Sequence, residues 1–224
     1  IRASVDARGL AGLSAVAFSR TVLNAPQGAA ARALGLRGPT TTLATGPTVG
    51  LFATVLAAQA LMWRRDADHL VVAATDELDP LSVTLDPGDS AAERSEHSWP
   101  ALGGAAALVL STDGPGPVVL GVGLAGPGCL SQAVSAATSG REWPTSAVST
   151  AGTARLDAAW RAEVQGSFPD LVWHRGPGPT HGVGDSAGAL LAVHEAAERA
   201  AQGPVLVVAC HPGTGCAALL LGPA

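Results

Sequence analysis

The chain of 224 residues contains no lysine and no tyrosine, and only 4% of its residues are aromatic. All 13 basic residues are therefore arginine, and they form no cluster along the sequence, so the basic face of a nucleic-acid-binding protein is missing. Charged residues make up only 14% of the chain and hydrophobic residues 47%, a balance that excludes intrinsic disorder. The composition predicts a folded, acidic chain of net charge −5 that does not bind nucleic acid.

The sequence also has no apolar run long enough to span a bilayer, because Gly, Pro or polar residues interrupt each one. Residues 1–10 carry three charges and lack the apolar core of a signal peptide. The three cysteines have no metal-site spacing and cannot all pair within one chain; they are Cys129, Cys210 and Cys216. We therefore expect a cytoplasmic chain away from the membrane, with buried free thiols and with no metal or other cofactor.

Hydrophobic periodicity predicts a helix and two strands in the first half. Thr48 to Arg65 is rich in Ala and Leu, with hydrophobic positions almost all round, which favours a buried helix. His69 to Thr75 and Gly103 to Ser111 are short apolar runs typical of buried strands. The polar stretch from Asp76 to Pro100 is predicted to be a long surface loop.

The end of the chain repeats this order of helix, strand and strand. Ser186 to Ala201 is predicted as a helix, and Pro204 to Cys210 and Cys216 to Leu221 as strands. The pattern is a weak internal duplication, and repeats of this kind bear on the choice of fold. Further strands and helices are expected between the halves, at Val118–Leu124, Leu130–Gly140, Arg155–Gln165 and Leu171–His174. Apolar helices and continuous apolar strands together indicate an α/β fold.

Five segments, in the same order, resemble β-ketoacyl synthases. NAPQGAAARALGLRGP, residues 24–39, resembles the segment before the strand that carries the family's nucleophile, and Thr40 to Thr45 would be that strand. The other segments are VVAATDE, WPALGGAAALVLS, GVGDSAGALLAVHEA and HPGTGCAALLLG. The resemblance implies a thiolase-like layered α/β/α fold, shortened, with two pseudo-repeated halves. Residues 1–224 would form one such unit, with halves of about 1–115 and 116–224.

The catalytic positions of the family are lost. Counting from the GLRGP turn, Pro47 stands where the family has its nucleophilic Cys, and proline has neither a nucleophile nor a backbone N–H. Gly182 falls near the position of a catalytic His, with His181 one place away. Nothing matches the HGTGT motif of the other catalytic His, and His174 lies nearby in a different context. The resemblance therefore implies no catalytic residues and no condensation on this chain alone.

A ketosynthase-like chain without its nucleophile resembles a chain length factor, in the short form found in polyene and aryl polyene type II polyketide synthases. That resemblance implies a heterodimer with an active ketosynthase, whose acyl chain grows into a tunnel at the subunit interface; a homodimer stays possible. The acyl carrier protein, usually acidic, would dock mainly on the partner, because this chain is acidic too. Interface and tunnel candidates are Phe18, Thr42, Thr45, Pro47, Thr48 and Phe52.

Two enzymatic alternatives compete with this interpretation. The motif GDSAG around Ser186 resembles the nucleophile elbow of serine esterases, which needs a preceding strand and a later acid and His. The only acids after Ser186 are Glu195 and Glu198, on the same predicted helix, and they cannot orient His194 or His211 as a strand-end acid would. Decarboxylation of a malonyl group without condensation is the other alternative, but family members that do this carry Gln at the position of the nucleophile.

Overall fold

The structure is a computed structural model that describes residues 22–44, 46, 48–64, 66–76, 104–150, 154–176, 185–211 and 213–224. The chain divides into two compact units, Ile1–Ala44 and Thr45–Ala224. The first unit contains one described helix, α3 (Ala25–Leu34), which was not expected from the sequence. Its start is favoured by Pro26 in the first turn, and Gly35 ends it in the left-handed conformation, at φ 66°.

The repeated order of helix, strand and strand predicted from the sequence is confirmed in the second unit. The first copy consists of α4 (Val49–Trp63), β1 (His69–Asp76) and β2 (Gly104–Ser111). The second copy consists of α9 (Asp185–Arg199), β6 (Val205–His211) and β7 (Gly215–Gly222), with the 3₁₀ turn η3 (Ala200–Gln202) after the helix. In each copy the two strands pair antiparallel.

The second copy belongs to a five-stranded sheet in the order β3-β7-β6-β4-β5. The added strands are β3 (Val118–Ala125), β4 (Ser146–Ser149) and β5 (Val172–Arg175), connected through the helices α7 (Leu130–Thr138) and α8 (Ala154–Gln165). β4 pairs parallel with β5 and β6, whereas β7 runs antiparallel to both of its neighbours. Among the described residues, β1 and β2 pair only with each other.

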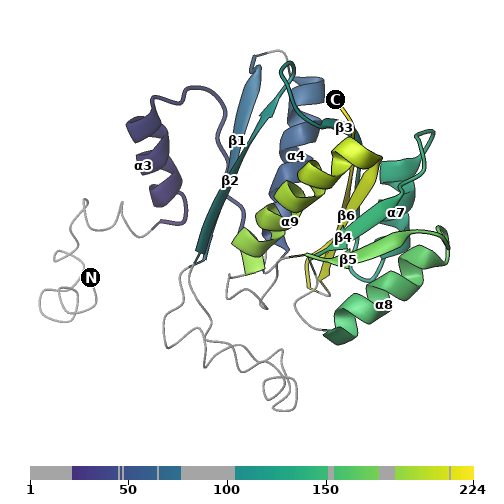
Figure 1. Cartoon of the computed structure of the whole chain (residues 1–224). Helices are drawn as coiled ribbons and strands as arrows, with labels where there is room; N and C mark the ends of the chain where they lie inside the picture. The colour runs from purple at the N-terminus through teal and green to yellow at the C-terminus, as the bar shows by residue number, and fades with distance from the viewer. Residues whose placement is uncertain are drawn as a thin grey trace, which may run out of the picture. The chain divides into compact units, whose positions relative to one another are not determined.

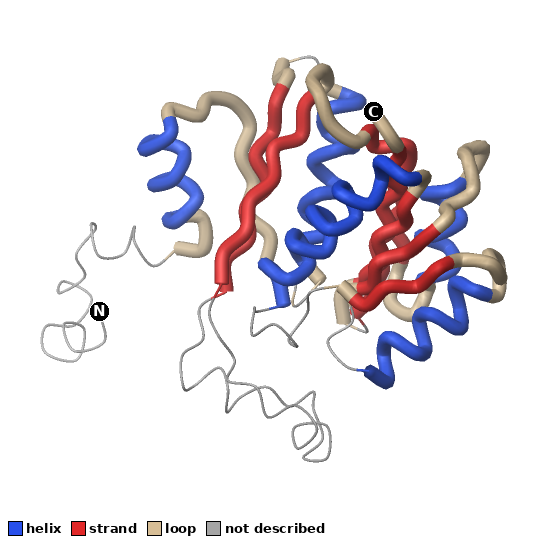
Figure 2. Tube along the Cα trace, viewed as in Figure 1, coloured by secondary structure: helices blue, strands red, loops and turns tan. Residues whose placement is uncertain are grey.

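Within the second unit, α4 and α9 form a layer between the two sheets (Figures 1 and 2). Leu51 and Val55 of α4 pack with α9 and with one face of β6 and β7. Leu190 of α9 packs with Val72 and Ala74 of β1 on the other side of the helix layer. A further core joins the opposite face of the five-stranded sheet to α7 and α8. The layered α/β fold expected from the sequence is thus present.

The central helices approach each other closely at Gly50 of α4. A methyl group placed there would lie 2.3 Å from the backbone oxygen of Ser186 and 3.1 Å from Cβ of Ala189, both on α9. Only glycine leaves room for that approach. The expectation that α4 is buried all round is wrong: Leu56, Met62 and Trp63 are 38%, 65% and 84% exposed. Nothing among the described residues covers its C-terminal end. The helix therefore has more apolar side chains than the described part of the chain buries.

Two other expectations from the sequence differ from the structure. The strand expected over Thr40 to Thr45 is absent from residues 40–44, which have no regular structure and are mostly exposed. A strand forms only against a partner that accepts and donates its backbone hydrogen bonds, and periodicity cannot show whether one is present. The short buried strand β4 was not predicted, because its sequence, SAVS, has only two apolar residues and so shows no pattern. The loop expected over Asp76 to Pro100 lies outside the described residues beyond Asp76.

Candidate functional site

Two residues of the predicted interface set, Thr48 and Phe52, lie at the N-terminus of α4 in the second unit. Thr48 is the N-cap residue and is only 4% exposed, and its carbonyl accepts the N–H of Phe52 at 3.3 Å. Phe52 is half-buried one helical turn later. The carbonyl of Gly46 accepts the N–H of Val49 at 3.1 Å, which ties the preceding turn to the helix. This helix start is therefore fixed by backbone bonds rather than by a side-chain cap.

The other predicted positions are not among the described residues of the second unit. Thr42 lies in the N-terminal unit, exposed, and lines an open groove of about 580 Å³ within that unit. Phe18, Thr45, Pro47 and Gly182 lie outside the described residues. Their roles stay predictions from the sequence.

The turn between β6 and β7 lies against the segment that precedes α4. A methyl group at Gly46 would be 3.8 Å from Cε1 of the His211 ring, and one at Gly215 would be 3.5 Å from the Phe52 ring. The same group at Gly215 would come within 2.5 Å of the carbonyl oxygen of Ala125, so glycine is required there, at φ +121°. The final Gly-rich hairpin thus lies against Gly46 and Phe52, on either side of the start of α4.

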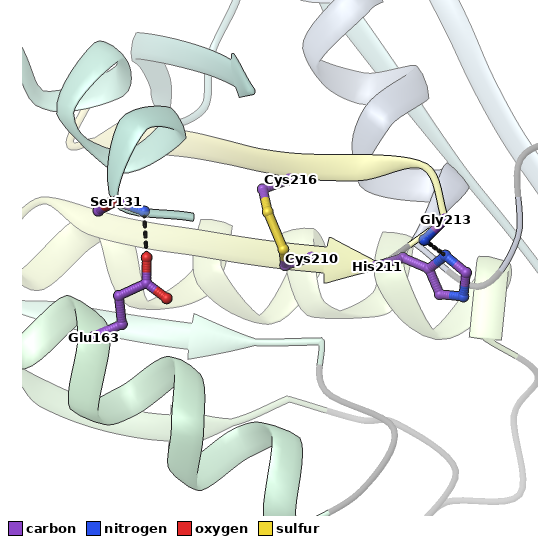
Figure 3. The surroundings of a disulfide bond; sticks show 6 residues. All are labelled: Ser131, Glu163, Cys210, His211, Gly213 and Cys216. Carbon is purple, nitrogen blue, oxygen red and sulfur yellow. Dashed lines mark hydrogen bonds between the residues drawn. A yellow bond between two sulfur atoms is a disulfide. The ribbon is translucent and has the colours of Figure 1, made fainter. Parts of the chain in front are cut away.

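His211 lies at this turn and was not predicted from the sequence to have a functional role. The backbone N–H of Gly213 donates to its Nδ1 at 3.1 Å (Figure 3). Because Nδ1 accepts, a neutral ring carries its proton on Nε2. A general base needs an unprotonated nitrogen that faces the reacting group and is oriented by an acceptor on the other side. His211 has the opposite arrangement, so it can donate a hydrogen bond but is not set up as a base.

Two buried hydroxyl oxygens have no hydrogen-bond partner in the protein: Oγ1 of Thr48, at the start of α4, and Oγ1 of Thr214, in this turn. Thr214 follows His211 in the turn, and its N–H donates to the His211 carbonyl at 3.2 Å. A buried polar group without a partner costs about 1–3 kcal/mol, so such groups are uncommon and call for an explanation. Hydrophobic periodicity cannot predict such groups, because it does not report on hydrogen bonds.

The cysteines correct an expectation. Cys210 and Cys216 face each other as a register pair of β6 and β7 and form a disulfide, whereas Cys129 is free (Figure 3). Free thiols are expected from the sequence because three cysteines give no pairing rule; the antiparallel register brings these two together. The disulfide closes the hairpin one residue pair away from His211 and Gly215.

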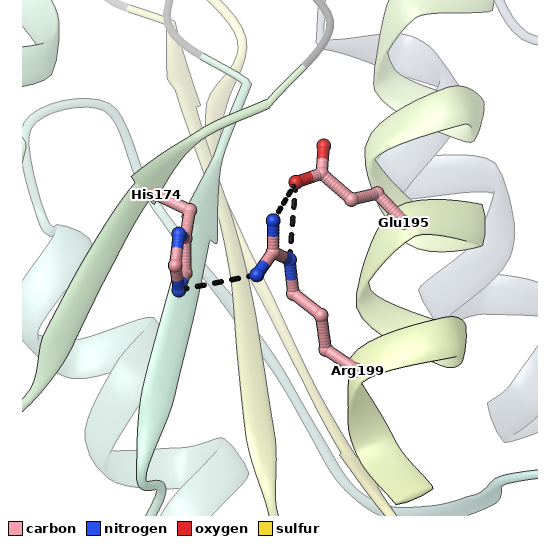
Figure 4. A network of polar contacts seen from close by, with 3 residues as sticks. All are labelled: His174, Glu195 and Arg199. Atoms are coloured by element: carbon pink, nitrogen blue, oxygen red, sulfur yellow. Dashed lines mark hydrogen bonds and ion pairs between the residues drawn. The ribbon is translucent and has the colours of Figure 1, made fainter. Parts of the chain in front are cut away.

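His174 belongs to a different polar network, between β5 and α9 (Figure 4). Arg199 donates from Nε and Nη2 to Oε1 of Glu195, at 3.1 and 2.7 Å, and Nη1 approaches Nε2 of His174 at 3.4 Å. A guanidinium can only donate, so Nε2 of His174 accepts. Burial, followed by the charge of Arg199, lowers the pKa of His174 below its usual range. This network holds β5 to α9, and no catalytic role follows from it.

The esterase alternative gains no support. Ser186 lies in the first turn of α9, and its backbone oxygen faces Gly50 of α4. The N–H of the next residue, Ala187, donates to Oδ2 of Asp76 at the end of β1, at 2.7 Å. That carboxylate at the positive end of the helix dipole stabilises the helix start. Residues 177–184, where the strand that leads into an elbow would lie, are outside the described residues.

Within the described ranges, no three His, Cys, Asp or Glu side chains gather so that they could hold a metal ion. Among the helices that the structure describes, none is both long and apolar enough to cross a membrane.

No protein-family model matches the sequence, and a search of curated proteins finds no relative. Solved structures do match. A chain of the ishigamide ketosynthase/chain length factor has 23% identity and a TM-score of 0.65, over 98% of this chain and 67% of that one. A β-ketoacyl synthase from Burkholderia phymatum has 12% identity and a TM-score of 0.74, over 100% and 71%.

These matches, together with the duplicated helix-strand-strand order, define a ketosynthase-like, thiolase-type fold, as the resemblance in the sequence implied. A further match is more particular: the ketosynthase ApeO in complex with its chain length factor ApeC from Xenorhabdus doucetiae, at 15% identity and a TM-score of 0.70, over 100% of this chain and 71% of that one. The solved structures that match this chain thus include a β-ketoacyl synthase and complexes of a ketosynthase with a chain length factor.

Proposed function

We propose that this chain is a non-catalytic, chain-length-factor-like subunit that pairs with an active ketosynthase and shapes its acyl tunnel. One observation carries the proposal: a ketosynthase-like fold has Pro47 where the nucleophile is expected. Condensation through a thioester needs a nucleophile at that point, and proline has none. Among the described residues, the imidazole of His211 lies near Gly46, and its Nδ1 accepts the N–H of Gly213, so its proton is on the wrong nitrogen for a base.

Exposed segments supply a surface for the partner. Residues 40–44 have no strand of their own and include the exposed Thr42, and the resemblance assigns this segment to subunit pairing. Met62 and Trp63 at the end of α4 are also exposed. Obligate partners bury large apolar surfaces, and strands pair readily across subunits. The proposal treats residues 1–224 as one unit with halves of about 1–115 and 116–224.

The reaction itself belongs to the partner. The ketosynthase would supply the Cys and both His residues, and the acyl carrier protein would dock mainly on it, because this chain carries a net charge of −5. A polyene or other polyketide chain would extend into the tunnel beside Thr48 and Phe52. We place the complex in the cytoplasm. In that reducing compartment the Cys210–Cys216 disulfide would be open to reduction by cellular thiols.

Co-expression with the neighbouring ketosynthase tests this proposal. We expect a one-to-one complex on sizing that extends a carrier-bound chain, an activity that is lost when the partner's Cys is replaced and kept in Ser186→Ala. Thr42→Asp should prevent co-purification by placing a charge in the pairing segment, whereas Thr112→Asp, at another exposed threonine, should not. A monomeric chain that hydrolyses a short acyl ester alone would overturn the proposal.

A further inference from the structure

The Cys210–Cys216 disulfide joins two strands that are paired without it. β6 and β7 pair along nearly their whole length. Each strand has a second neighbour on its other side, β4 beside β6 and β3 beside β7. A disulfide stabilises a fold mainly by restricting the unfolded chain, and it contributes least where the loop that it closes is short. These cysteines have a sequence separation of only 6, so we expect the hairpin to persist when the bond is open.

The two cysteines differ in exposure. Cys216 is 0% exposed and belongs, with Leu130, to the core that joins the sheet to α7 and α8. Cys210 packs against the same core but is only partly buried. Thiol–disulfide exchange begins when a thiolate attacks one sulfur, and access decides which one. An incoming thiol can therefore attack Cys210 while the fold stays closed over Cys216.

The disulfide lies beside the turn that contacts the start of α4. The cysteine pair is followed at once by His211 opposite Gly215, the last register pair of the hairpin. A methyl group at Gly46 would lie 3.8 Å from the His211 ring, and one at Gly215 would lie 3.5 Å from the Phe52 ring. The end of a hairpin opens more easily than its middle, because fewer bonds hold it. A covalent link one pair away suppresses that opening and keeps the turn against Gly46 and Phe52.

We propose that Cys210 and Cys216 form a redox switch, which holds the β6–β7 turn against the start of α4 when oxidised and releases it when reduced. The inference rests on the proposed function only for the cytoplasmic location, where the disulfides that do form are usually transient or redox-sensing. The switch lies wholly in this chain, and the strands of the hairpin stay paired in both states.

A dithiol reductant supplies the two electrons and two protons of the reduction. One of its thiolates attacks Sγ of Cys210, the S–S bond breaks, and Cys216 leaves as a thiolate and takes up a proton. The second thiolate of the reductant then attacks the first sulfur of the reductant, which closes the reductant's own disulfide and releases Cys210 as a second thiol. Oxidation by glutathione disulfide runs the other way: a glutathione adduct forms on Cys210, and Cys216 displaces the glutathione.

Hydrogen exchange in the full chain, measured by NMR before and after treatment with dithiothreitol, tests the switch. We expect the amides of Gly213 and Thr214 in the turn, and of Val49 at the start of α4, to exchange about 10-fold faster in the reduced chain. The amide of Arg64, which bonds at the other end of α4, should not change. Cys129→Ser keeps the disulfide pair and should respond as the wild-type chain does. Equal exchange in both redox states, or unfolding on reduction, would overturn the switch.

The order of attack gives a second test, made on reduced chains that also carry Cys129→Ser. With glutathione disulfide, Cys216→Ser should accumulate a glutathione adduct on the partly exposed Cys210, whereas Cys210→Ser should form little on the buried Cys216. Mass spectrometry of the intact chain measures both adducts, and equal labelling would contradict the access that the switch requires. If the chain pairs with a ketosynthase but shows neither response, the switch fails and the proposed function stands. If both responses occur and no complex forms, the proposed function fails instead.

Discussion

Gly50→Ala should destabilise the second unit by forcing its two central helices apart. The new methyl group would lie 2.3 Å from the backbone oxygen of Ser186. Carbon and carbonyl oxygen approach to about 3.3 Å at closest, so α4 and α9 must separate by about 1 Å. Overpacking of this kind costs about 1–3 kcal/mol, and the better helix propensity of Ala returns up to about 1 kcal/mol. We expect a net loss of about 1–2 kcal/mol in the free energy of unfolding.

Thermal unfolding followed by circular dichroism measures this loss. For a chain of this size, 1–2 kcal/mol corresponds to a fall in Tm of about 2–8 °C. Gly28→Ala is the matched control, because a methyl group there meets nothing closer than the Arg32 guanidinium at 3.9 Å. It should leave Tm unchanged or raise it slightly. An unchanged or higher Tm for Gly50→Ala would refute the close approach of the helices.

Three further predictions follow from polar contacts and the disulfide. Because the pKa of His174 is lowered in the folded chain, the unfolded chain binds more protons below about pH 6.5, and the free energy of unfolding falls as pH falls through that range. Chemical denaturation at pH 7 and pH 5.5 should show a smaller loss of stability in His174→Asn than in the wild-type chain. An equal loss in both would contradict the assignment. Trp173→Phe removes the indole N–H that donates to Asp157 at 3.0 Å. It should lower the free energy of unfolding, measured with urea, by about 1–2 kcal/mol. An unchanged free energy of unfolding would show that this hydrogen bond is absent. Dithiothreitol should lower the free energy of unfolding by about 2 kcal/mol, because it opens the loop closed by the Cys210–Cys216 disulfide. It should not affect a variant with Ala at both cysteines. An equal response of the variant and the wild-type chain would rule out the disulfide.

The fold was largely predictable because its long elements have strong patterns. Val205–His211 and Gly215–Gly222 are continuous apolar runs, and the structure buries nearly every residue of both strands. The helix Val49–Trp63 was predicted to within two residues at each end, but its burial was overestimated. Composition reveals that a surface is apolar and does not reveal which partner covers it. The short β4 and the helix α3 were missed because neither has a clear hydrophobic period.

The site was less predictable, because it is made by register and by side-chain orientation. The resemblance led to Pro47 and Thr48, which are close to each other in the sequence. Nothing in the sequence brings His211 beside Gly46, since 165 positions separate them and only the packing of the hairpin joins them. The disulfide was missed for the same reason: the register of β6 against β7 pairs Cys210 with Cys216, and sequence spacing alone does not fix a register.

The two copies of the helix-strand-strand repeat differ in how firmly they are held. β6 is bonded on one side to β7 and on the other to β4, whereas β1 is bonded, in the described part of the chain, to β2 alone. Backbone amides in β6 therefore exchange with solvent only when the whole sheet opens, while those of β1 and β2 exchange through a smaller, local opening. The second repeat acts as the stable frame of the molecule, and the first as the part that can adjust while the frame persists.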